Sequence, residues 1–172
     1  PTLQRLYDAY AQDDTLVIYR LEEYWEPLAH FCRALQQYFS CLSNASLFLT
    51  PQNAQGFPPH SDPGDMLILQ VEGSKVWRIY NSSPDLVPSK DDSSYILHQL
   101  PTPEQEIYLE AGDLLYIPSG CVHEVLTTDE PSLHLSIAII PFTWADLITK
   151  ALTSVGKQNS SIHKALPVGF LN

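Results

Sequence analysis

The segment Gly112–His123 reads GDLLYIPSGCVH. Its apolar run ends at residues 118–120, the Pro-Ser-Gly group, which is typical of a tight turn, and a second apolar run begins directly afterwards. We therefore expect a strand over Asp113–Ile117, a turn, and a second strand over Val122–Thr127. In a small barrel, this arrangement would place His123 near the mouth.

The same alternation of turns and short apolar runs extends over the middle of the chain. Ten of the fourteen prolines and five of the seven glycines lie between residues 51 and 131. Besides the two strands above, the predicted strands are Leu47–Thr50, Met66–Val71, Lys75–Tyr80, Tyr95–Gln99, Glu106–Leu109 and Leu133–Ile140. The turn at residues 72–74 is expected to join the second and third of these as a β-hairpin. Eight short strands predict a mainly β fold, either a β-barrel or a jelly roll.

The two ends of the chain have helical patterns instead. Apolar residues recur at helical spacing in Thr2–Ala11 and Glu22–Ser40. Thr143 is expected to cap a helix over Ala145–Val155, and a further short helix to start near Ser160. We therefore predict three parts, namely an N-terminal flank over residues 1–43, a barrel over residues 44–141 and a C-terminal helical extension over residues 142–172.

Charge excludes two classes of partner. The chain has 9 Lys and Arg residues against 20 Asp and Glu residues, a net charge of -11, and between residues 34 and 149 the basic residues are Lys75, Arg78 and Lys90. Proteins that bind nucleic acids or anionic membranes rely on basic groups, so neither partner is expected. No apolar run approaches the roughly 20 residues needed to span a bilayer.

The cysteines indicate an intracellular protein that is not secreted. Cys32, Cys41 and Cys121 are scattered and form no CxxC pair, which excludes a disulfide scaffold and a structural zinc module. Because the chain begins at Pro1 without a Met, we expect it to be cut from a longer protein, with the C-terminal extension truncated.

The strongest chemical signal combines two segments. In His60-Ser61-Asp62, the first and third residues point to the same side of an extended chain, and prolines on both sides stiffen the backbone. If His123 points inward, it can join His60 and Asp62. Two histidines and one carboxylate with open positions opposite are the arrangement of non-haem Fe(II) oxygenases.

Lys75 begins an apolar strand in a segment with almost no positive charge. One interpretation makes it a residue of the barrel rim. The other makes it a cation inside the barrel that holds a carboxylate-bearing cosubstrate, since buried charges are rarely tolerated without a partner.

Several of these motifs, in this order, closely resemble the JmjC 2-oxoglutarate oxygenases. The motifs are NAQGFPPHSD at residues 53–62, LQVEGSKVWRIY at residues 69–80, Leu49-Thr50-Pro51, Gly112–His123 and SLHLS at residues 132–136. The resemblance covers residues 44–141 and is greatest to the ribosomal oxygenase branch, which hydroxylates ribosomal proteins. It implies a double-stranded β-helix, the jelly roll of the cupin superfamily, with flanking α-helices.

The resemblance also implies roles for individual residues. His60, Asp62 and His123 match the iron ligands of the family, and Lys75 matches the basic residue that binds the distal carboxylate of 2-oxoglutarate. Candidate hydrogen-bond donors to that cosubstrate are Thr50 and Ser136, and candidate pocket residues are Phe48, His134 and Trp77.

Two features depart from the branch. Ser46 and Phe48 stand where ribosomal oxygenases commonly have Asn and Tyr, and Phe48 cannot donate a phenolic hydrogen bond. The surroundings of the cosubstrate are therefore expected to differ in part. The winged-helix segment that follows the barrel in that branch is absent or barely begun, which leaves substrate docking and dimerisation open.

The predicted function is that of an Fe(II)- and 2-oxoglutarate-dependent dioxygenase that uses O2 to hydroxylate a protein of the ribosomal type. The alternatives within the enzyme class are a JmjC N-methyl-lysine demethylase, a tRNA-base or small-molecule hydroxylase and a Zn²⁺ hydrolase. The alternative of another class is a non-catalytic cupin-like module that binds a protein. The acidic barrel favours a basic substrate, ribosomal or histone-like, and a homodimer is an open prospect.

Overall fold

The computed structural model describes residues 2–80 and 102–169. The predicted strand Tyr95–Gln99 lies outside the described residues. The chain divides into two compact units, Pro1–Pro141 and Phe142–Asn172. The first unit holds the N-terminal flank together with the barrel strands.

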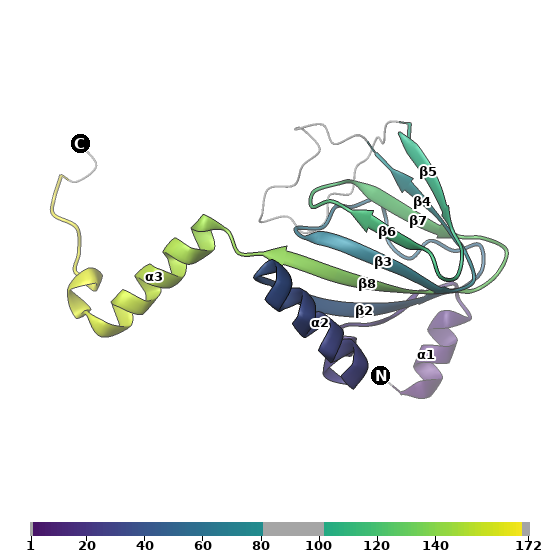
Figure 1. The fold of residues 1–172 in the computed structure, drawn as a ribbon, viewed down its shortest axis with the longest axis horizontal. Coiled ribbons are helices and arrows are strands. Elements are labelled where there is room, and N and C mark those ends of the chain that lie inside the picture. The colour runs from purple at the N-terminus through teal and green to yellow at the C-terminus, as the bar shows by residue number, and fades with distance from the viewer. Residues whose placement is uncertain (1, 81–101, 170–172) are drawn as a thin grey trace. The chain divides into compact units, whose positions relative to one another are not determined.

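Two antiparallel sheets form the first unit (Figure 1). The five-stranded sheet has the order β1-β2-β8-β3-β6 and the three-stranded sheet the order β5-β4-β7. The strands are β1 Leu16–Ile18, β2 Cys41–Thr50, β3 Asp65–Glu72, β4 Lys75–Ile79, β5 Gln105–Leu109, β6 Leu114–Ile117, β7 His123–Thr127 and β8 Ser132–Pro141. This mainly β arrangement of two sheets confirms the predicted jelly roll.

The predicted hairpin at residues 72–74 is wrong. β3 pairs with β6 and β8, whereas β4 pairs with β5 and β7, so the turn carries the chain from one sheet to the other. Gly73 lies in the left-handed region with φ of 63°, and a Cβ there would meet the carbonyl oxygen of Pro131. A glycine in a short turn is thus compatible with a change of sheet as well as with a hairpin.

The main core lies between the two sheets. Inward residues of both sheets form it, and the buried members are Ile68, Trp77, Leu109 and Ile117. Neighbouring residues of β4 alternate between this core and the opposite face, because successive side chains of a strand point to opposite sides. The interior therefore receives Lys75 and Trp77 from β4, both almost fully buried.

A helix covers the outer face of the five-stranded sheet. α2, Glu26–Phe39, packs Leu28 and Cys32 against Ala45 of β2 and Ile137 of β8 (Figure 1). The helix expected from residue 22 begins later, since Pro27 occupies its first turn, and a short 3₁₀ helix η1, Leu21–Glu23, precedes it.

One strand boundary differs from the prediction by several residues, and one strand was not predicted. β2 begins directly after α2 at residue 41 rather than 47, because Ser40 takes a left-handed conformation that ends the helix and turns the chain. The three-residue strand β1 was not predicted, since it is too short to produce a periodic pattern.

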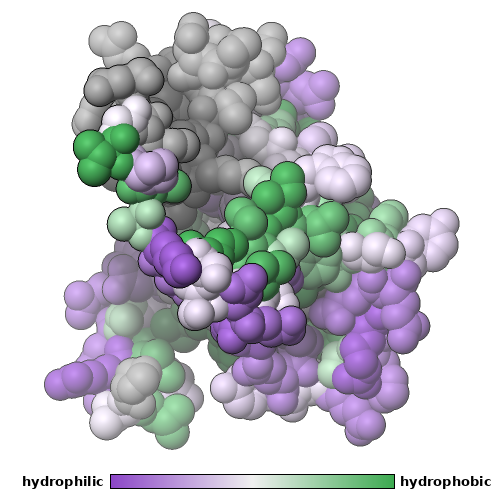
Figure 2. Space-filling view, turned by 90° about the vertical axis from the view of Figure 1, so that its left-hand side faces the viewer, coloured by the Kyte–Doolittle hydropathy of each residue, from purple (hydrophilic) through white to green (hydrophobic). Residues whose placement is uncertain are grey.

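The remaining helices lie at the ends of the chain. α1 is Leu3–Tyr10, and the second unit contains α3, Trp144–Gln158, and a short 3₁₀ helix η3, Ser160–His163. Thr143 caps α3 as predicted, because its hydroxyl accepts from the backbone N–H of Asp146. No side chain of α3 is buried, and on the face that Figure 2 shows, apolar side chains reach the surface among polar ones. None of the helices in residues 2–80 and 102–169 combines the length and apolar character needed to cross a bilayer.

Candidate metal centre

A backbone pairing brings the two candidate metal-binding histidines together. The N–H of His60 donates to the carbonyl of His123 at 3.0 Å, and the N–H of His123 donates to the carbonyl of His60 at 2.8 Å. The first residue lies in the connection between β2 and β3, and the second begins β7. This pairing sets the two rings with their centroids 4.6 Å apart.

Each ring is held through its Nδ1 atom. Nδ1 of His60 lies 2.9 Å from the carbonyl oxygen of Pro58, and Nδ1 of His123 lies 3.0 Å from that of Cys121. A carbonyl oxygen only accepts hydrogen bonds, so both Nδ1 atoms carry a proton, and Nε2 is the atom of each ring that can bind a metal. Burial, and next the neighbouring His60, lower the pKa of His123, which favours the neutral form that binds metals.

Asp62 completes the group. Its Oδ2 lies 3.7 Å from Nε2 of His123, and its side chain is one-third exposed. Its backbone carbonyl accepts from the N–H of Gly120 at 2.9 Å, which links it to the turn before β7. One ligand atom from each of the three residues lies within 4.8 Å of the other two. The predicted triad is therefore assembled, with two imidazoles and one carboxylate on one side and room opposite.

Lys75 lies inside the barrel rather than at its rim, with 1% of its surface exposed. Its Nζ is 3.0 Å from Oγ1 of Thr50 and 2.7 Å from Nδ1 of His134. Both partners are neutral groups, and burial lowers the pKa of Lys75 to about 7. The structure thus places a cation in the interior whose two hydrogen-bond partners carry no negative charge.

His134 connects this lysine to the wall of the cavity. Burial, followed by the charge of Lys75, lowers its pKa well below the usual value. The neutral ring accepts from Nζ of Lys75 at Nδ1, stacks parallel to Phe48 at 4.8 Å and meets Trp77 edge-on at 5.5 Å. Phe48 therefore contacts His134 through the face of its ring.

A cavity of about 300 Å³ opens beside the triad. It is lined by Tyr19, Phe48, Phe57, Pro58, His60, Asp62, Met66, Ile68, Trp77, His123, Val125, His134 and Ser136. The indole N–H of Trp77 is buried and has no hydrogen-bond partner in the described part of the chain. It is a donor available to a ligand, because an unsatisfied buried donor is costly.

The candidate residues fall into two groups around this cavity. Ser136, Phe48, His134 and Trp77 line it, as expected of pocket residues. Thr50 does not line it and instead contacts Lys75 and Thr15 from behind the wall.

Some lining residues were not predicted. Val125 follows His123 by two positions in β7, and Met66 and Ile68 alternate in β3, so the two-residue period could have identified them. Tyr19 follows the short strand β1, for which the sequence offers no comparable signal.

Comparison with known proteins identifies the family to which the chain is similar. The family model described as the JmjC domain matches residues 21–147. The protein named bifunctional lysine-specific demethylase and histidyl-hydroxylase NO66 is 40% identical in Drosophila grimshawi, over 154 residues covering 85% of this chain and 21% of that protein. Its namesake in Dictyostelium discoideum is 41% identical over 125 residues, covering 70% of this chain and 24% of that protein. The chain thus spans less than a quarter of the length of these relatives.

Solved structures agree on the fold. Escherichia coli ycfD superposes with a TM-score of 0.68 at 21% identity, covering 91% of this chain and 41% of that one. A structure of YcfD, described as a ribosomal oxygenase in complex with cobalt and 2-oxoglutarate, gives a TM-score of 0.65 at 20% identity and covers 91% of this chain and 39% of that one. With the family model matching residues 21–147, the chain belongs to the JmjC domain family.

Proposed function

We propose that this chain is the catalytic barrel of an Fe(II)- and 2-oxoglutarate-dependent oxygenase that hydroxylates a side chain of a basic protein. The observation that carries the proposal is the pairing of two features at one cavity. Three metal-ligating side chains converge on one side of it, and behind its wall lies a buried lysine whose hydrogen-bond partners are neutral.

The donor set fits the proposed metal. Two imidazole nitrogens and one carboxylate oxygen suit Fe(II), and their placement on one side leaves the remaining positions for other ligands. His60, Asp62 and His123 would hold the metal. With 2-oxoglutarate and O2, it would supply the oxidant that inserts one oxygen atom into a C–H bond, while 2-oxoglutarate leaves as succinate and CO2.

The interior polar groups fit a dicarboxylate. Lys75 would provide the cation for the carboxylate remote from the metal, and a bound carboxylate would hold its proton at neutral pH. The hydroxyl of Ser136 and the unpaired N–H of Trp77 are further donors at the cavity wall. A Zn²⁺ hydrolase built on the same ligands would have no use for such a cation, so Lys75 favours the oxygenase.

Charge and the named relatives support the choice of substrate. A net charge of -11 favours a basic partner through electrostatic steering. The relatives are named histidyl-hydroxylases and a neighbour in the solved structures is described as a ribosomal oxygenase. Aromatic side chains of the cavity wall, Phe48 and Phe57 among them, suit a flat ring. We therefore propose a histidine of a ribosomal protein as the target.

Mass spectrometry of basic ribosomal peptides tests this proposal. After incubation with the protein, Fe(II), 2-oxoglutarate and O2, a histidine-containing peptide should gain one oxygen atom while succinate forms in equal amount. His123→Ala is the control and should give neither product. Succinate without a modified peptide from any ribosomal source would refute the substrate, and the absence of succinate would refute the oxygenase.

Lysine demethylation is the second candidate, because the relatives' name also includes that activity. Hydroxylation of an N-methyl group would release formaldehyde, so formaldehyde from a methylated histone peptide would favour it over hydroxylation. A tRNA-base or small-molecule substrate and a non-catalytic protein-binding role remain the alternatives, and an intracellular location and a homodimer remain predictions.

A further inference from the structure

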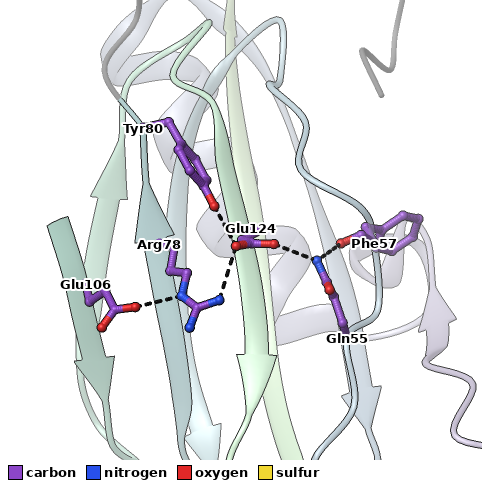
Figure 3. A network of polar contacts seen from close by, with 6 residues as sticks. All are labelled: Gln55, Phe57, Arg78, Tyr80, Glu106 and Glu124. Atoms are coloured by element: carbon purple, nitrogen blue, oxygen red, sulfur yellow. Dashed lines mark hydrogen bonds and ion pairs between the residues drawn. The ribbon is translucent and has the colours of Figure 1, made fainter. Parts of the chain in front are cut away.

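Figure 3 shows a polar network on one face of the three-stranded sheet. Because Glu124 directly follows His123 in β7, this face is opposite the one that carries the metal-binding histidine. The centre of the network is Glu124, which is 8% exposed. This carboxylate accepts from the hydroxyl of Tyr80 at 2.6 Å, from a guanidinium nitrogen of Arg78 at 3.4 Å and from Nε2 of Gln55 at 2.9 Å. Three donors from two segments, the end of β4 and the loop that contains Gln55, thus hold one buried carboxylate, as its desolvation requires.

This network touches both segments that carry metal-binding histidines. Glu124 directly follows His123 in β7. Nε2 of Gln55 also donates to the carbonyl of Phe57 at 3.1 Å, in the segment that leads to His60 (Figure 3). One amide group therefore links the carboxylate beside one histidine to the backbone that precedes the other.

The link to His60 passes through a stiff segment. Between Phe57 and His60 stand Pro58 and Pro59, whose rings fix two of the backbone φ angles. The carbonyl of Pro58 is the group that accepts from Nδ1 of His60 and so orients its ring. A displacement of the Phe57 carbonyl would be transmitted to that acceptor with little room for relaxation.

The backbone around Gln55 is held without its side chain. Gln55 pairs with Leu126 of β7 in a β-bridge, and the N–H and carbonyl of Ala54 bond to the hydroxyl of Thr127 at 2.9 and 3.1 Å. Gln55 itself is exposed. The side-chain amide of Gln55 is therefore not needed to anchor the loop. What it adds is a hydrogen bond to the carbonyl oxygen of Phe57.

We propose that Gln55, held in place by Glu124, is a positioning residue that sets the orientation of the His60 ring at the metal centre. The inference rests on the proposed function for its metal, but it concerns residues that contact neither metal nor cosubstrate. Removal of a group hydrogen-bonded directly to a metal ligand typically changes metal affinity by about 10- to 100-fold, and because Gln55 acts on that group only through the backbone, we expect an effect near the lower end of this range.

Titration of the full chain with Co(II) tests the inference. Gln55→Met keeps the length of the side chain and removes only the amide, and it should weaken Co(II) binding by about 10-fold or more and alter the visible absorption of the bound ion. The thermal unfolding midpoint should stay close to the wild-type value, because the backbone anchors remain. Gln55→Glu should weaken binding at least as much, since its carboxylate cannot donate and would repel Glu124.

Glu106→Gln is the matched control. It removes the negative charge of the exposed partner of Arg78, at 2.7 Å, and leaves the contact between Gln55 and Glu124 in place, so Co(II) affinity should not change. A Gln55→Met protein that binds Co(II) within twofold of wild type, with the same spectrum, would overturn the inference. A loss of affinity matched by an equal loss in the control would also overturn it.

The same titration separates this inference from the proposed function. If wild-type protein binds Co(II) but 2-oxoglutarate does not change the spectrum, the oxygenase proposal fails, and the comparison of Gln55→Met with wild type still decides the positioning role. If wild-type protein binds no Co(II), both proposals fail.

Discussion

Each face of the three-stranded sheet carries one positively charged side chain, and the surroundings of the two charges are opposite. Lys75 and Arg78 lie three residues apart in β4 and point to opposite sides. Arg78 contacts the carboxylates of Glu106 at 2.7 Å and Glu124 at 3.4 Å, and hydrogen bonding to Glu106 is the first cause that raises its pKa. Lys75 contacts the neutral Thr50 and His134, and burial lowers its pKa to about 7.

The difference separates a structural cation from one that is available to a ligand. The outer charge is neutralised by the protein itself and contributes to the fold. The inner charge has been removed from water, and its hydrogen-bond partners, Thr50 and His134, do not compensate it, which is a cost in the ligand-free protein. A bound ligand with a negative charge would offset this desolvation cost.

The largest effect is expected from a substitution that removes a metal ligand on the inner face of the sheet. His123→Ala removes one of three ligands, so we expect no visible Co(II) absorption at protein concentrations where the wild type saturates. Glu106→Gln, a change on the outer face, serves as the control. An unchanged Co(II) spectrum in His123→Ala would remove this residue from the ligand set.

Lys75→Met should have the next largest effect. A charge-assisted hydrogen bond contributes about 1.5–3 kcal/mol, so the dissociation constant of 2-oxoglutarate should rise about 10- to 100-fold, measured by calorimetry with Co(II) bound. Co(II) affinity should stay within about twofold, since the lysine is no ligand. The ligand-free variant should be at least as stable as wild type in urea at pH 6, because the desolvated charge is gone. A clear loss of stability would contradict the cost inferred for the inner cation.

The dependence of 2-oxoglutarate binding on pH should reveal the same charge. The pKa of Lys75 falls from 10.5 to about 7 in the fold, so above pH 7 the free protein loses the proton that a bound carboxylate requires. The dissociation constant should therefore be flat below pH 7 and rise up to about tenfold per pH unit above it. In Lys75→Arg the guanidinium stays charged, so weaker binding that does not change between pH 7 and 9 is expected. A flat wild-type profile would contradict the assignment.

The smallest effect is expected on the outer face. Arg78→Met leaves Glu124 buried without the cation beside it, which should destabilise the protein by about 1–2 kcal/mol in urea unfolding. Binding of 2-oxoglutarate should stay within about threefold of wild type. The binding free energy of 2-oxoglutarate could instead change by more than the free energy of unfolding. The outer face would then contribute to cosubstrate binding and not only to the stability of the fold.

Much of the metal site could be predicted because its ligands belong to local motifs. His60 and Asp62 share a side of an extended segment, and His123 follows a turn that brings it to a strand end. The alternation of β4 likewise placed Lys75 and Trp77 on one side, whichever sheet the strand joined.

The contacts between distant segments could not be predicted. The turn at Gly73 suits a hairpin and a change of sheet equally well, and only the packing of β3 against β8 and of β4 against β7 selects the second. His134 accepts from Lys75 across 59 residues, and Gln55 donates to Glu124 across 69. Partners this far apart leave no periodic pattern in the sequence.

The sequence by itself determined which side chains share a face, because strand periodicity is a local property of the backbone. It determined in this way the mainly β class, the shared side of His60 and Asp62 and the shared side of Lys75 and Trp77, whereas the rim or interior position of Lys75 was left open until the structure placed it inside. The tertiary structure decided which groups contact each face of the sheet. Lys75 contacts neutral groups, and Arg78 contacts carboxylates. The reason is physical, since burial and charge pairing depend on elements that come together only when the two sheets close over a common core.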